Sequence, residues 1–182
     1  MTRISFDTPC YFITSVTHHR LPVFRTDKFK DLICEALNEA RTSSGMLYFA
    51  YSIMPEHFHI VTDGERKPSD TLRYLNGITA RRIIDHLKEN GPEASLNKLR
   101  LAETAGGYKY SLWEHHSDKF LLTSESMFMQ KVRYVNNNPV NDGLVARAED
   151  YKYSSARYWL RKPLLDDEPL EMDINKIEWY SK

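Results

Sequence analysis

The sequence predicts an α+β fold in which helices pack on a mostly antiparallel sheet, close to a ferredoxin-like core. Segments rich in β-branched and aromatic residues alternate with segments of helical apolar spacing, in the order β, α, β, β, α, β, α. Only Pro55-Glu56 separates the two middle β segments, which is typical of an antiparallel hairpin. At 182 residues, the chain has the length of a single domain.

The first half of the chain supplies three strands and one helix. Residues 10–18 are rich in β-formers, and from Asp27 apolar residues recur at helical spacing until Ser43-Ser44-Gly45 ends the pattern. Residues 47–54 and 57–63 are the two strands of the expected hairpin.

The middle of the chain predicts a long helix, a loop and a further strand. Ser69 can cap the helix, which should end near residues 90–92 because Asn-Gly-Pro stops helices. Residues 92–109 are polar and contain glycine, so we expect a loop. Residues 110–116 (YSLWEHH) have the composition of a strand.

A third helix is expected over residues 125–138, with Thr123 or Ser124 as its N-cap. It should end near Asn138, because the residue before a proline is disfavoured in the α region. Residues 150–161 can form a short extra helix.

Composition limits the classes to which the protein can belong. No apolar run approaches the roughly 18 residues that a membrane span needs, and the N-terminal residues lack the pattern of a secretion signal, so we expect a cytoplasmic protein with no membrane partner. Residues 163–182 hold six acids and two lysines, which leaves 23 basic and 19 acidic residues in 1–162. We therefore expect a mildly basic domain over 1–162 and an acidic C-terminal tail over 163–182.

His57 and His59 stand two residues apart in the second strand of the hairpin. Strand periodicity places both imidazoles on one face and Phe58 and Ile60 on the other. Two such imidazoles can bind a divalent cation when a third ligand is supplied elsewhere. Ordinary surface histidines on a half-exposed strand give the same pattern, so the motif alone leaves both interpretations open.

Tyr134 and Asn138 lie one turn apart on the third expected helix, beside its apolar stripe. A tyrosine hydroxyl can attack phosphorus as a covalent nucleophile, and the amide oxygen of Asn138 is a hard metal ligand. Taken singly, each has a simpler explanation, Tyr134 as an interfacial aromatic residue and Asn138 as a residue at a helix end.

Two separated motifs together carry a family resemblance. Residues 54–59 (MPEHFH) and, some 75 residues later, 134–140 (YVNNNPV) with 143–145 (GLV) resemble the bacterial single-tyrosine HUH transposases, above all their REP-associated tyrosine transposase branch. The resemblance includes residues 150–155 (DYKYSS) and covers most of residues 9–160 in the same order.

This resemblance implies an HUH endonuclease-type core over 1–162 that cuts and rejoins single-stranded DNA, often beside a hairpin. It implies Tyr134 as the catalytic nucleophile that forms a 5′-phosphotyrosine. It also implies His57, His59 and Asn138 as ligands of Mg²⁺ or Mn²⁺. The sequence favours neither a monomer nor a homodimer.

Candidate DNA contacts follow from charge and aromatic character. Basic residues concentrate between 66 and 88. We expect four basic side chains to contact the DNA backbone: Arg81, Arg82, Lys131 and Arg133. Base stacking would fall to one of three aromatic residues: Tyr108, Tyr110 or Trp113.

Two alternatives to a cutting transposase stay open. One is a domesticated DNA- or RNA-binding module of the same fold that does not cut. The other is a metal-dependent hydrolase with water as the nucleophile. In the hydrolase, His57 and His59 would share the metal with one further residue: Glu114, His115, His116 or Asp118.

Overall fold

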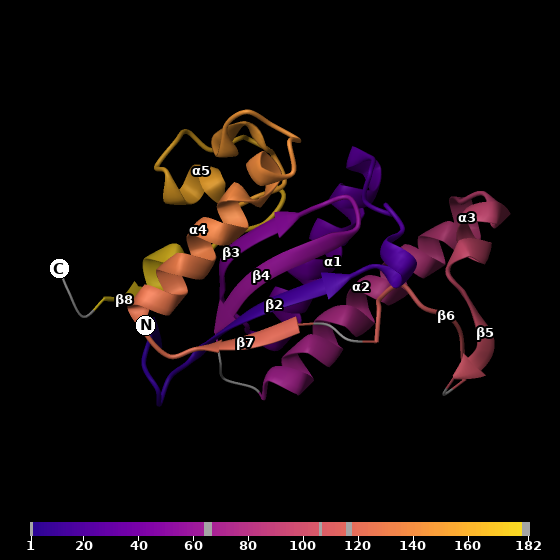
Figure 1. The fold of residues 1–182 in the computed structure, drawn as a ribbon, viewed down its shortest axis with the longest axis horizontal. Coiled ribbons are helices and arrows are strands. Elements are labelled where there is room, and N and C mark those ends of the chain that lie inside the picture. The colour runs from indigo at the N-terminus through magenta and orange to yellow at the C-terminus, as the bar shows by residue number, and fades with distance from the viewer. Residues whose placement is uncertain (1, 64–66, 106, 116–117, 180–182) are drawn as a thin grey trace.

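A four-stranded antiparallel sheet with the order β3-β4-β2-β7 forms the centre of the molecule (Figure 1). The computed structural model describes residues 2–63, 67–105, 107–115 and 118–179. The strands of the sheet are β2 (Cys10–Val16), β3 (Tyr48–Ile53), β4 (His57–Asp63) and β7 (Asp118–Leu122). This arrangement confirms the predicted α+β, ferredoxin-like architecture.

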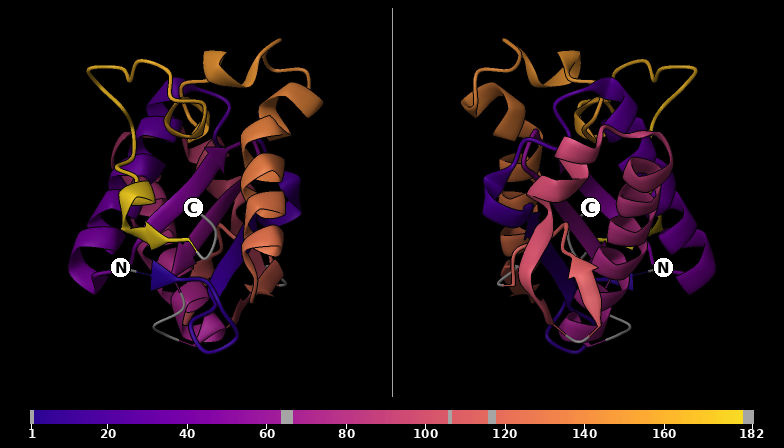
Figure 2. Two further views of the ribbon diagram at one scale, coloured as in Figure 1. Left: turned by 90° about the vertical axis from the view of Figure 1, so that its left-hand side faces the viewer. Right: turned by 90° about the vertical axis from the view of Figure 1, so that its right-hand side faces the viewer.

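Three long helices cover the two faces of the sheet. They are α1 (Asp27–Ser44), α2 (Pro68–Asn90) and α4 (Glu125–Asn141). Strand β4 sends Phe58 and Ile60 into one core with α1 and α2, and Val61 into a second core with α4. The sheet therefore lies between α4 and the α1–α2 pair (Figure 2). None of the helices in the described parts of the chain is both long and apolar enough to cross a membrane.

The predicted elements of the first half are confirmed. Helix α1 ends where expected, because Gly45 takes the left-handed conformation (φ 75°) that closes a helix and its N–H bonds to the carbonyl of Arg41. Strands β3 and β4 pair as the expected hairpin around Pro55 and Glu56.

The predictions for residues 92–116 are wrong. The expected loop over 92–109 contains α3 (Glu93–Lys98) and two paired strands, β5 (Arg100–Ala105) and β6 (Tyr108–Tyr110). Of the strand expected over 110–116, Tyr110 ends β6 and the described residues 111–115 form no strand, while His116 lies outside the described residues; β7 is the fourth strand of the sheet. Two β-forming residues of this segment, Leu112 and Trp113, are instead buried in the hydrophobic core.

Two helix boundaries also differ from the prediction. Helix α2 begins at Pro68 rather than after Ser69, because a proline fits the first turn, where its missing N–H costs nothing. Helix α4 is capped by Ser124, whose hydroxyl accepts from the Met127 N–H, and it passes Pro139 before ending at Asn141. A proline so close to the helix end disturbs only the last turn.

The C-terminal segment 163–182 packs against the rest of the chain at three buried positions of its described part: Leu170, Asp173 and Ile177. It follows the short helix α5 (Ala156–Trp159), and Leu170 is completely buried. Strand β8 (Ile177–Glu178) pairs in parallel with β1 (Thr2–Arg3), so the two ends of the described chain lie side by side.

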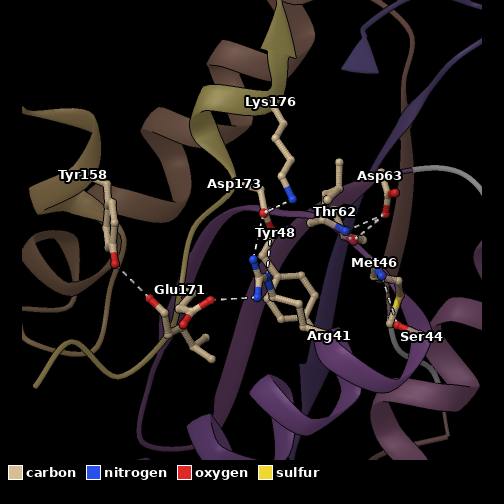
Figure 3. A network of polar contacts seen from close by, with 12 residues as sticks. Arg41, Ser44, Met46, Tyr48, Thr62, Asp63, Tyr158, Glu171, Asp173 and Lys176 are labelled. Carbon is tan, nitrogen blue, oxygen red and sulfur yellow. Dashed lines mark hydrogen bonds and ion pairs between the residues drawn. The ribbon is translucent and has the colours of Figure 1, made fainter. Parts of the chain in front are cut away.

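Asp173 anchors this segment through the polar network shown in Figure 3. One carboxylate oxygen accepts from Arg41 Nε (2.8 Å) and from the Tyr48 backbone N–H (3.0 Å). The other accepts from Arg41 Nη2 (2.8 Å) and pairs with Lys176 Nζ (2.9 Å). Burial alone would raise the pKa of Asp173, but these bonds outweigh it and lower the pKa to about 2.

Candidate active site

His57 and His59 lie on the face of β4 that α4 covers. Their ring centroids are 4.7 Å apart, which confirms that the strand places both imidazoles on one side. Both side chains are buried, because α4 and the neighbouring strands close over them. These histidines are therefore not ordinary surface residues.

Each imidazole is held at Nδ1 by a polar neighbour. Thr14 of β2 lies opposite His59 in the sheet register, with its hydroxyl 2.8 Å from His59 Nδ1. The Glu56 carboxylate lies 3.3 Å from His57 Nδ1. Such contacts fix the orientation of an imidazole and leave Nε2 as the atom available to a ligand.

The two Nε2 atoms face the amide of Asn138. His57 Nε2 lies 3.2 Å from Asn138 Oδ1. His59 Nε2 is buried and has no hydrogen-bond partner among the described residues. Burial lowers the pKa of His59 to about 3, helped by His57 and by the ammonium of Lys131, while the Asn138 side chain opposes the shift. His59 is therefore neutral at physiological pH.

Tyr134 lies at the solvent-exposed edge of this cluster of His57, His59 and Asn138. Its ring centroid lies 5.3 Å from that of His59 and 5.9 Å from that of Phe12 on β2. Unlike the histidines, Tyr134 keeps 43% of its surface exposed. The arrangement thus combines a partly exposed tyrosine with buried nitrogen and oxygen atoms that could act as metal ligands.

The apolar stripe of α4 sets this geometry. Phe128, Val132 and Val135 are buried against the sheet, which fixes the rotation of the helix about its axis. Tyr134 and Asn138 lie one turn apart on the flank that this rotation turns toward β4. Four residues predicted from two distant motifs are thereby brought together.

The predicted DNA contacts divide between the two faces of the sheet. Lys131 lies beside Tyr134, with its ammonium 5.4 Å from the tyrosine ring centroid, and Arg133 is exposed on the same helix. Arg81 and Arg82 belong to α2 on the opposite face, and both pair with Glu39 of α1. The structure therefore does not bring these two arginines to the tyrosine.

The three aromatic candidates for base stacking differ in their exposure and position. Trp113 is a wrong prediction, because it is buried and its indole N–H donates to the Asn76 carbonyl and to the Thr79 hydroxyl. Tyr110 lines a groove of about 890 Å³ between α2 and the β5–β6 pair, together with Arg81. The side chain of Tyr108 lies outside the described residues, as do His116 and Arg66.

Sequence reasoning missed three residues that border the cluster. Glu56 precedes His57 in the motif, and this adjacency was a usable signal. Thr14 required the register between β2 and β4, which the sequence does not contain. Phe120 lies on β7, in a segment where no strand was expected.

Comparisons with known proteins agree with this architecture. The family model described as "Transposase IS200 like" matches residues 8–98, half of the chain, including the histidine strand but not Tyr134. The solved structure of a REP-associated tyrosine transposase bound to a REP hairpin has a TM-score of 0.61 and 15% identity, covering 91% of this chain and 87% of that one. At that identity the likeness shows the fold.

Other comparisons add less. A candidate transposase from Deinococcus radiodurans is 21% identical, with a TM-score of 0.49 over 71% of this chain and 90% of that one. None of the curated proteins matches the sequence. The family match over half of the chain, on the fold just described, shows that the protein belongs to the IS200-like transposase family.

Proposed function

We propose that this transposase cuts and rejoins single-stranded DNA with Tyr134 as its covalent nucleophile. The observation that carries the proposal is the position of an exposed Tyr134 beside two buried imidazoles, 5.3 Å from the nearer ring. Phosphoryl transfer needs a nucleophile that DNA can reach and a nearby site that stabilises negative charge. The cluster offers both.

The reaction balances without an energy source. The Tyr134 oxygen forms a bond to phosphorus, the bond from phosphorus to the 3′ oxygen breaks, and that oxygen takes up a proton as the phenol loses one. The products are a 5′-phosphotyrosine and a free 3′-OH. Because the phosphodiester is conserved, attack by another 3′-OH can rejoin the DNA.

The residues present fit a divalent cation. His59 Nε2 is a buried nitrogen without a hydrogen-bond partner among the described residues, and His57 Nε2 lies 3.2 Å from the Asn138 oxygen. Neighbouring ligands of an octahedral cation with bonds of about 2.1 Å are about 3 Å apart. His57, His59 and Asn138 would hold Mg²⁺ or Mn²⁺, which when bound would polarise a phosphate oxygen and offset charge in the transition state.

Thr14→Val is expected to weaken Mn²⁺ binding by about 10- to 100-fold, because it removes the hydroxyl that orients His59 and keeps the side-chain shape. Calorimetric titration of the protein with Mn²⁺ measures this. Thr62→Val is the matched control, since it removes a buried threonine hydroxyl that bonds to the Leu47 carbonyl, on the face of β4 opposite to the histidines. Equal Mn²⁺ affinity in the two variants would show that Thr14 does not position the ligand.

The DNA partner is proposed to be a single strand beside a hairpin. The related solved transposase is bound to a REP hairpin, and this chain shares its fold. Lys131 and Arg133 would contact the backbone near the cut, while Arg81 and Arg82, on the other face, would hold a more distant part of the same DNA.

The test is a search for a covalent DNA adduct. Wild-type protein is incubated with Mn²⁺ and hairpin oligonucleotides carrying single-stranded flanks, labelled at either end, and separated on a denaturing protein gel. The 3′ label should travel with the protein, the 5′ label should appear on a free fragment, and EDTA should abolish both products. Cleavage without an adduct would instead support the water-dependent hydrolase, and binding without cleavage the non-cutting module.

The hydrolase would need a third metal ligand beside His57 and His59. Among the described residues, no group of three His, Cys, Asp or Glu side chains is arranged to hold a metal. Glu114, one of its candidate ligands, instead accepts from the backbone N–H of His19 and lies 3.9 Å from His18 Nδ1. His116 lies outside the described residues.

A further inference from the structure

The surface next to Tyr134 carries a second exposed aromatic ring, Phe120 of the edge strand β7. Phe120 keeps 50% of its surface exposed, although the residue opposite it in the sheet, Phe12, is buried. The centroids of Phe12 and Phe120 are 6.0 Å apart, and Phe12 also meets Tyr134 edge-on. Phe12 is thus a buried ring that contacts two exposed rings, those of Phe120 and Tyr134.

The ammonium of Lys131 lies close to all three rings. It lies 4.5 Å from the Phe12 centroid, 4.8 Å from that of Phe120 and 5.4 Å from that of Tyr134. No carboxylate of the described residues pairs with it, whereas most basic side chains of α2 have acidic partners. A positive charge held beside aromatic faces without a counterion suits an anionic ligand.

A flat apolar face beside a cation matches a nucleotide, which presents a base and a phosphate at a similar spacing. Bases stack on exposed aromatic rings, and such stacking requires a base that is not already paired inside a duplex. Phe120 and Lys131 lie on the same side of the sheet as Tyr134, so a nucleotide held by them would adjoin the proposed cutting site.

We infer that Phe120 and Lys131 form a nucleotide subsite, in which one unpaired base next to the cut stacks on Phe120 and its phosphate pairs with Lys131. The inference rests on the proposed function, because it places single-stranded DNA beside Tyr134. It adds a positioning element that neither sequence motif contains. The subsite would select single strands over duplexes and set the register of the strand relative to the nucleophile.

The test measures binding apart from cutting. Oligonucleotides with a hairpin and a single-stranded 5′ extension, in which fluorescent 2-aminopurine replaces each unpaired base in turn, are bound to the Tyr134→Phe protein in EDTA. One position should be quenched by stacking. Introducing Phe120→Ala as a second substitution in the Tyr134→Phe protein should abolish that quenching and raise the Kd for the oligonucleotide about tenfold. Phe120→Leu, which keeps apolar bulk without a flat ring, should lose the quenching as well.

Leu121→Ala is the matched control, because Leu121 is the next residue of β7, is 43% exposed and points to the other face. It should leave the quenching intact and the Kd within about twofold of its parent's. In the same assay Lys131→Met should lower the slope of log Kd against log salt by roughly 0.7, the value for one phosphate contact with a single strand, while Phe120→Ala should not change it.

Two results would overturn the subsite. One is quenching that survives Phe120→Ala, and the other is an equal loss of affinity in Phe120→Ala and Leu121→Ala. Because no step of this assay requires cleavage, its failure is distinct from failure to detect a covalent adduct. Quenching without any adduct in the wild type would retain the subsite and refute the nucleophile.

Discussion

Replacing Tyr134 by phenylalanine is expected to eliminate the covalent DNA adduct and to lower cleavage at least about 10⁴-fold, as removal of a catalytic nucleophile does in other enzymes. Only the hydroxyl is lost. The ring keeps its contacts with His59 and Phe12, and the residue is 43% exposed, so the fold and DNA affinity should be preserved. Adduct yield on a denaturing gel and the rate of strand cleavage measure the effect.

Tyr158→Phe is the control for this prediction. It removes a tyrosine hydroxyl that donates to the Leu170 carbonyl, away from the histidine cluster. Cleavage should be unaffected by this change. If Tyr134→Phe cleaved as fast as Tyr158→Phe, the tyrosine mechanism would be wrong and another nucleophile would have to be sought.

Asp173→Ala is expected to lower the free energy of unfolding by about 3 kcal/mol, because it removes a buried carboxylate that accepts hydrogen bonds from Arg41 and from the Tyr48 N–H. Arg41 would lose two short hydrogen bonds, and the Tyr48 N–H would lose its acceptor. For a chain of this size the midpoint of thermal unfolding should fall by roughly 6–12 °C. Calorimetry or circular dichroism measures the shift.

Arg3→Ala provides the contrast, because it breaks an ion pair with Glu178 whose partners are both about half exposed. Such pairs contribute little, so the unfolding midpoint should barely move. Equal shifts in the two variants would show that the C-terminal segment is not anchored through Asp173.

The Asp173 contribution also has a defined pH dependence. The carboxyl has its pKa lowered from 3.8 to about 2 in the folded protein, so its bonds stabilise the fold fully above pH 4 and are lost as the pH falls toward 2. The difference in unfolding midpoint between wild type and Asp173→Asn should therefore shrink over that interval. A difference that stays constant would assign the effect to packing rather than to charge.

Periodicity allowed a large part of the fold and site to be predicted. Alternation along β4 placed His57 and His59 on one face, and helical spacing placed Tyr134 and Asn138 on one flank of α4. Both patterns are local, since each follows from the geometry of a single element. That the two elements meet came from the family resemblance, and the structure supplies the contact between His57 and Asn138.

The rest depended on tertiary context. Strand β7 is exposed at four of its five residues, so it lacks the apolar alternation that identifies a strand in sequence. Residues 110–116 are rich in aromatic and other β-forming residues, as a strand would be. Trp113 is instead buried in the core, where its indole N–H donates to Thr79 of α2. Charge alone groups Arg81 and Arg82 with Lys131 and Arg133 as expected DNA contacts, and only the layering of the sheet places the two pairs on opposite faces.

The position of α4 has a genetic consequence. In the single chain that the structure describes, the tyrosine helix lies over the histidine strand of the same polypeptide. If the working site is built within one polypeptide in this way, alleles that lack the proposed nucleophile and alleles that lack an imidazole are expected to fall into one complementation group. Two defective copies in the same cell would not restore a working one between them.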